Sequence, residues 1–334
     1  MITTRDAITT PECLRAPIQT IALLTVWGIV SACVDCNVTP TEGSGTPLGP
    51  REPEAGVRAL LKDLQEWDSA TDDERLAAAH AVERRVPGIS FSRMEKFSCG
   101  SQTHSIAVFL HRQLGLELSL IPGGTSQMGS PIDEPGRFSD ELQHRVTLTH
   151  PFLVSRHVIT QAAYERIAGK REFPVPGADF PATGLSWYVA KGLCERIGLR
   201  LPTEAEWEYA CRGGATTAWY FGDDEELLSE YADYPSISAS NIAQPVGRKR
   251  PNAFGVFGMH GGVREWCADW YGDYPRSEAT DPSGPARGVR RVIRGGDWDV
   301  PHGTRCARRG SSPPEESPQD AGVRPVLPIG VTAR

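Results

Sequence analysis

The chain has 334 residues, enough for one large domain with an appendage or for two domains. Its formal net charge is −7, so no overall basic field points to nucleic acid, and we expect no nucleic-acid partner. The 34 glycines and 27 prolines favour turns and ordered loops over long helices.

Residues 18–30 form a strongly apolar run, too short to anchor a chain across a bilayer. The run is followed by Ser31, Ala32 and Cys33, an order typical of a bacterial lipoprotein signal. We therefore expect a lipoprotein signal peptide at 1–33, lipidation of Cys33, and a protein anchored to the cell-envelope membrane that faces the periplasm or the exterior. An ordinary secretory signal and a buried helix in a chain that stays inside the cell are the alternatives.

Residues 34–56 are rich in Pro, Gly, Thr and Glu, which predicts a flexible linker. Residues 57–101 are interpreted as a helical N-terminal appendage. Its first helix covers 57–67, where apolar residues have helical spacing. Thr71 and Glu74 form a capping-box pattern, which predicts a second helix from there to about residue 85.

The remaining segment, 102–334, is predicted to be one α+β domain with few long elements and much ordered loop. Alternating apolar residues indicate strands at 104–110, 116–121 and 144–149. Caps and periodicity indicate helices at 161–168, 187–197 and from the second capping box at Thr203 to Cys211. Residues 291–294 predict a strand, followed by a Gly-Gly turn at 295–296.

Several motifs occur in a fixed order along this domain: PGGTSQMGS (122–130), GLRLPTEAEWEYACRGG (198–214), PNAFGVFGMHGGVREW (251–266), RVIRGGDW (291–298), RCARR (305–309) and AGVRP (321–325). Together they resemble the sulfatase-modifying-factor family, whose founding activity is that of the formylglycine-generating enzyme. The resemblance implies a C-type-lectin-like fold with small twisted sheets, few helices and long packed loops.

The founding enzymes oxidise a substrate cysteine with a pair of cysteines that bind Cu(I), because soft thiolates select this ion. The resemblance puts the first of these cysteines four residues after the Gly-Gly pair, where this chain has Val300. The second position falls in a gap or near Arg305. We therefore expect no catalytic residues, no copper and no formylglycine-generating activity.

The resemblance implies a disulfide between Cys211 and Cys306, with two buried free thiols as the alternative. It leaves Cys194 as a small buried thiol, and Cys99 and Cys267 without an assigned partner.

The resemblance also points to weakened calcium sites, whose remaining candidate ligands are Glu265 and Asn241. Acidic and amide ligands expected beside Glu265 are replaced by Gly258 and Gly262. A structural hydrogen-bond acceptor is the favoured role of Glu265, and we expect no cofactor.

The favoured function is a membrane-tethered extracytoplasmic binding or accessory module, a pseudoenzyme in its family. It would contact an unknown protein or small-molecule ligand through the key loop 297–304, with candidate contacts at Asp297, Trp298, Asp299, His302 and Arg305. Two rivals stay open: an active formylglycine-generating-type oxidase with non-standard ligands, and a structural envelope lipoprotein.

Overall fold

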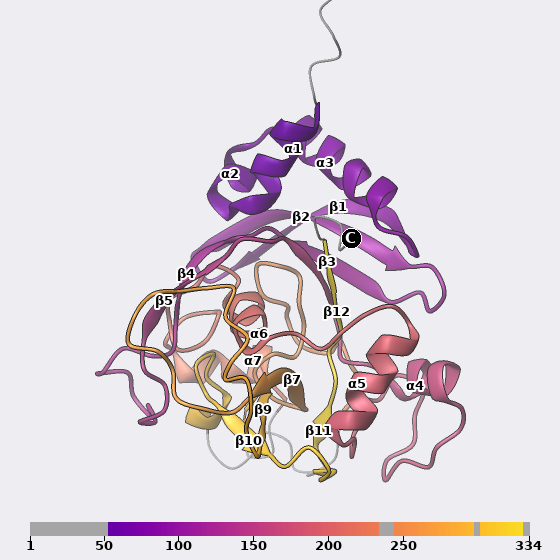
Figure 1. Cartoon of the computed structure of the whole chain (residues 1–334), viewed down its shortest axis with the longest axis vertical. Coiled ribbons are helices and arrows are strands. Elements are labelled where there is room, and N and C mark those ends of the chain that lie inside the picture. Colours follow the sequence, from indigo (N-terminus) through magenta and orange to yellow (C-terminus); the bar gives the residue numbers. More distant parts are fainter. Residues whose placement is uncertain (1–52, 234–243, 297–300, 330–334) are drawn as a thin grey trace, which may run out of the picture. The chain divides into compact units, whose positions relative to one another are not determined.

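The computed structural model describes residues 53–233, 244–296 and 301–329. The predicted signal peptide with Cys33 and most of the predicted linker lie outside these ranges, as do Asn241 and residues 297–300. Figure 1 shows helices above one sheet, with most of the remaining chain below it. Within the described ranges, no helix is both long and apolar enough to cross a membrane.

Three helices open the described chain: α1 (Pro53–Lys62), α2 (Leu64–Ser69) and α3 (Asp72–Arg85). The predicted linker end at 56 was wrong, because α1 begins at Pro53. The predicted helix 57–67 is divided at Asp63, whose carboxylate accepts hydrogen bonds from the backbone N–H groups of Gln65 and Glu66 in the first turn of α2. The capping box of Thr71 and Glu74 is confirmed and starts α3.

The five-stranded sheet has the order β1-β2-β3-β6-β12, and all neighbouring pairs are antiparallel. Its strands are β1 (Ile89–Cys99), β2 (Gln102–His111), β3 (Glu117–Ile121), β6 (Phe152–Ser155) and β12 (Val326–Pro328). The prediction of a helical appendage to residue 101 was therefore wrong for 89–99. That segment pairs with β2 from end to end and belongs to the main sheet.

Both faces of this sheet are buried. Ile106 of β2 joins the main core, whereas its neighbours Ala107 and Phe109 pack against the helices. Because successive side chains of a strand point to opposite faces, one strand serves both cores. Trp67 of α2 is fully buried and donates from its indole N–H to the carbonyl of Ser105, 2.7 Å away. The helices are thus packed on the domain through apolar burial and this hydrogen bond.

Two smaller sheets lie in the rest of the domain (Figure 1). One has the order β10-β9-β7-β11, and its strands are β7 (Arg264–Trp270), β9 (Arg291–Arg294), β10 (Gly310–Ser312) and β11 (Ala321–Gly322). The other is β4-β5-β8, made of β4 (Gly124–Met128), β5 (His144–Leu148) and β8 (Ala279–Thr280). Helical segments complete the described ranges: α4 (Gln161–Ala168), α5 (Trp187–Arg196), α6 (Glu204–Arg212), η1 (Glu225–Leu227), α7 (Leu228–Tyr231) and η2 (Pro301–Thr304). This arrangement confirms the α+β class.

Helix α6 is the centre of a buried ionic network that orders the surrounding loops. Its Glu204 accepts two hydrogen bonds from Arg309, at 2.7 and 2.9 Å. Its Glu208 pairs with both Arg212 and Arg294, and all of these side chains are at most 5% exposed. Arg294 also donates to backbone carbonyls of the 306–307 segment. Buried charges are tolerated only when they are paired. These ion pairs require a defined geometry, so they fix the conformation of the loops that carry them.

Candidate functional site

The two ends of the key loop lie close together. Gly295 and Gly296 both have φ of 101°, as a Gly-Gly turn requires. A Cβ added to Gly296 would lie 3.0 Å from the carbonyl oxygen of Gly303. The described part of the loop is the short helix η2. The predicted contacts Asp297, Trp298 and Asp299 lie outside the described residues.

Arg305 was predicted as a ligand contact, and this prediction was wrong. Its side chain is 0% exposed and forms ion pairs with Glu134 and Glu141. It also donates to the carbonyl oxygens of Gly136 and His302, at 2.6 and 3.0 Å. Every part of the guanidinium is therefore engaged inside the protein, and Arg305 ties the end of the key loop to the segment between β4 and β5.

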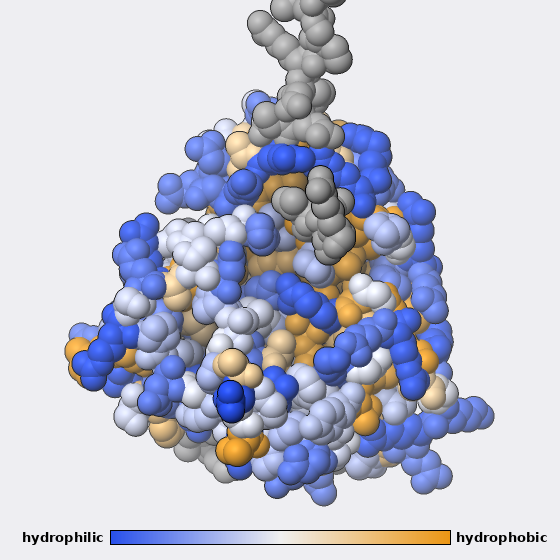
Figure 2. Space-filling view, viewed as in Figure 1, coloured by the Kyte–Doolittle hydropathy of each residue, from blue (hydrophilic) through white to orange (hydrophobic). Residues whose placement is uncertain are grey.

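We call the surface formed by residues 131–140 and His302 the rim. His302 is the predicted contact that lies on it, with a side chain 41% exposed and its ring stacked on Trp219. Gly136, at φ 72°, packs so closely on His302 that an added Cβ would lie 2.4 Å from the His302 Cβ. Ile132 and Phe138, in the same loop as Gly136, are 84% and 42% exposed. Figure 2 shows hydrophobic atoms among hydrophilic ones at the left edge, where Figure 1 draws the loop from β4 to β5.

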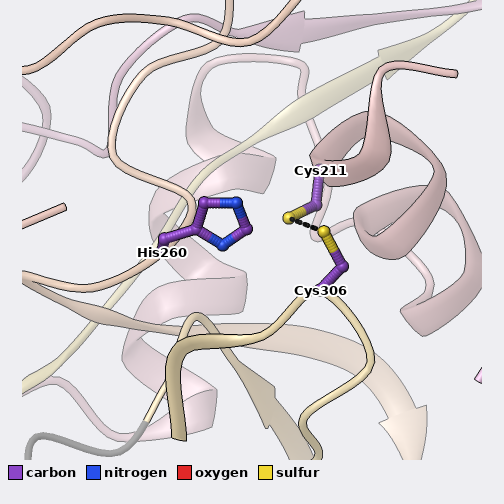
Figure 3. A group of neighbouring side chains, drawn as sticks. All are labelled: Cys211, His260 and Cys306. Carbon is purple, nitrogen blue, oxygen red and sulfur yellow. Dashed lines mark hydrogen bonds between the residues drawn. The ribbon is translucent and has the colours of Figure 1, made fainter. Parts of the chain in front are cut away.

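A second group of side chains lies inside the domain: Cys211, His260 and Cys306 (Figure 3). Cys211 is near the end of α6, His260 is in the turn before β7, and Cys306 follows η2. All three residues are 0% exposed. One potential ligand atom from each lies within 4.8 Å of the other two. The structure thus brings together the predicted Cys211–Cys306 pair as thiols whose sulfurs are 3.6 Å apart, and the disulfide itself stays a prediction.

The two thiols have different electrostatic surroundings. Burial opposes ionisation of Cys306, but a hydrogen bond from Cys211 and the positive charge of Arg212 outweigh it and hold the pKa of Cys306 well below its usual range. Burial and the neighbouring Cys306 raise the pKa of Cys211. The proton is therefore held more tightly on Cys211 than on Cys306.

His260 has a defined tautomer. Its Nδ1 lies 2.8 Å from the carbonyl oxygen of Thr304, so Nδ1 donates. Its Nε2 accepts a hydrogen bond from the backbone N–H of Tyr220 at 3.1 Å, so Nε2 carries a lone pair. Sequence reasoning missed this residue because it shows no local ligand spacing. The one usable signal was its place in GMHGG, inside a motif of the same domain.

Protein groups occupy the carboxylate of Glu265, the predicted calcium ligand. Both carboxylate oxygens accept hydrogen bonds from the Arg324 guanidinium, and one also accepts from the Trp207 indole at 2.7 Å. A guanidinium already occupies the place where a cation would bind. The favoured alternative, a structural hydrogen-bond acceptor, is confirmed. Cys194 is also confirmed as a buried free thiol.

The fold and these buried motifs define a domain of the formylglycine-generating-enzyme type with a C-type-lectin-like architecture. A model of the sulfatase-modifying factor enzyme 1-like domain matches residues 110–329, so the chain belongs to this family. The structure of PvdO from Pseudomonas aeruginosa resembles it with a TM-score of 0.60 and 29% identity, over 66% of this chain and 97% of that one.

Curated relatives include the serine/threonine-protein kinase pkn1 of Chlamydia pneumoniae, 32% identical over 224 residues. They also include the formylglycine-generating enzyme of Streptomyces coelicolor, 34% identical over 181 residues. These matches cover 58% and 49% of this chain, but only 35% of the kinase and 57% of the Streptomyces enzyme. The family therefore identifies the domain, while the activity of this chain is a separate question.

Proposed function

We propose that this chain is a binding module built on the sulfatase-modifying-factor scaffold. The observation that carries the proposal is the role of Arg305, which fixes the end of the key loop against the segment between β4 and β5. The anchored rim keeps Ile132, Phe138 and His302 at the surface. A preorganised surface of apolar and aromatic side chains suits recognition of a protein or a small molecule.

The state of the cysteines supports a binding role over an oxidase role. The founding reaction needs two open thiolates that accept Cu(I) and substrate. The first of these positions is Val300 in this sequence. Within the described ranges, all five cysteines are buried, at 4% exposure or less. None of them offers sulfur to a substrate thiol without opening the core.

The proposal includes a membrane tether. The apolar run before Cys33 is the basis for export and lipidation, and the module would face the periplasm or the exterior. Replacement of Cys33 by Ala should release the protein from membranes in a fractionation experiment. Extraction that still requires detergent would contradict lipidation.

Site-specific photo-crosslinking tests the contact surface. A photoreactive amino acid at Ile132, which is 84% exposed, should give a discrete adduct in envelope preparations. The matched control is Val289, 83% exposed and located before β9 rather than on the rim. His302→Ala should reduce the adduct at position 132 while the unfolding midpoint stays close to that of the unmodified protein. Equal adducts at both positions, or none at either, would favour a structural envelope role.

A further inference from the structure

The Cys211–His260–Cys306 cluster has the composition of a soft-metal site. Two thiols and one imidazole are the donor set that thiophilic ions such as Zn²⁺ and Cu⁺ prefer. The donors come from three segments, and 95 residues separate the two cysteines. An ion at this position would therefore join the end of α6, the turn before β7 and the end of the key loop.

The distance between the sulfurs fits a shared ion. With metal–sulfur bonds of about 2.3 Å, sulfurs 3.6 Å apart correspond to an S–metal–S angle of about 100°. This angle is close to the tetrahedral value. A disulfide instead requires the sulfurs to approach to about 2.05 Å. The side chains need little rearrangement to bind an ion, whereas they need a larger rearrangement to form the disulfide.

The orientation of the imidazole is fixed by hydrogen bonds at both ring nitrogens. His260 donates from Nδ1 to the Thr304 carbonyl, the outer hydrogen bond that fixes the ring of many metal-binding histidines. Its Nε2 lone pair is directed to the Tyr220 N–H and is free of a proton. Coordination would exchange this hydrogen bond for a bond to the ion. Thr304 lies two residues before Cys306, so the ring and the thiol are held by the same turn.

We propose that Cys211, His260 and Cys306 bind one thiophilic d10 metal ion, Zn²⁺ or Cu⁺, in a buried site of three protein ligands, which would leave a fourth position open on Zn²⁺. All three residues are fully buried, so the ion would be taken up during folding. It would hold the end of the key loop to α6. A disulfide between the two cysteines would remove both sulfur ligands, so a disulfide and a metal site can be distinguished by experiment.

The test uses the full chain, purified with a phosphine reductant and stripped of metal with a chelator. The chain is then unfolded in urea and refolded with Zn²⁺ or Cu⁺ alone in separate arms, because a buried site would be loaded during folding, and metal per chain is measured after desalting. We expect one equivalent of at least one ion in the wild type and almost none in Cys306→Ser or Cys211→Ser. His260→Gln should lose the ion to a chelator that the wild type resists. Cys194→Ser, which changes a buried thiol in another cluster, should keep it.

X-ray absorption on the loaded wild type avoids any folding defect of the variants. It should show two sulfurs at about 2.3 Å and one nitrogen at about 2.0–2.1 Å. An ion retained in Cys306→Ser, or a shell of nitrogen and oxygen alone, would overturn the proposal. It would also fail if the protein is isolated with a Cys211–Cys306 disulfide and binds neither ion after reduction.

Discussion

Replacing Arg305 by Met tests whether this side chain is a structural anchor. The substitution keeps much of the side-chain volume but leaves Glu134 and Glu141 without their partner. Their side chains are 6% and 0% exposed, so water cannot take the place of the guanidinium. Removing one member of a buried ion pair costs about 3–5 kcal/mol, and we expect a loss of free energy of unfolding of this size at neutral pH.

Urea unfolding followed by tryptophan fluorescence measures this loss. The control is Lys191→Met, which removes an exposed pair with Glu195, where we expect a change of about 0–0.5 kcal/mol. The Arg305→Met loss should be smaller near pH 5 than at neutral pH, because the unpaired carboxylates can then be protonated. Adding Glu134→Gln and Glu141→Gln should restore part of the stability. A loss below about 1 kcal/mol, well under the cost of a broken buried pair, would refute the anchoring role.

Three further predictions concern α6 and its surroundings. Burial and the nearby Glu204 raise the pKa of Asp269 to about 7, so its contribution to stability is complete below the ordinary carboxyl pKa and is lost as pH rises through about 7. Asp269→Asn should therefore gain about 1–3 kcal/mol relative to wild type between pH 4 and 7, and a pH-independent difference in urea unfolding would contradict this. Thr203→Ala removes a capping box and should cost about 1 kcal/mol by the same measurement, whereas unchanged stability would show that the cap is dispensable. Addition of Ca²⁺ should leave the Tm unchanged, because the Arg324 guanidinium already binds both carboxylate oxygens of Glu265. A calcium-dependent rise in Tm would support the calcium hypothesis.

Local features of the fold could be read from the sequence. The capping boxes at Thr71 and Thr203, the helix 161–168 and the strand 291–294 were all predicted, because caps and periodicity act within a few residues. Strand β1 was missed because only three of its eleven residues are buried, and its pairing with β2 defines it more than its own pattern. Strand β11 pairs in parallel with β7 over a large sequence separation, which local patterns do not reveal.

The candidate site also combines features that the sequence predicts with contacts that only the folded chain creates. The family motifs placed Cys211 and Cys306 together, and they lie in contact. Arg305 was taken for a surface contact because a charged loop residue is usually solvated. Its partner Glu141 lies 164 residues away, and only the folded chain brings that carboxylate to it. His260 was missed for a related reason. Its neighbours in the cluster, Cys211 and Cys306, lie far from it in the sequence, one before it and one after it.

The most direct test of the central claim is an oxidation assay on the full chain. Reduced protein is incubated with Cu⁺, oxygen and a CxPxR-type peptide, and the peptide is examined by mass spectrometry for conversion of its cysteine to formylglycine. The binding-module account predicts no conversion above a control without protein. Conversion above that background would contradict it and restore the oxidase with non-standard ligands.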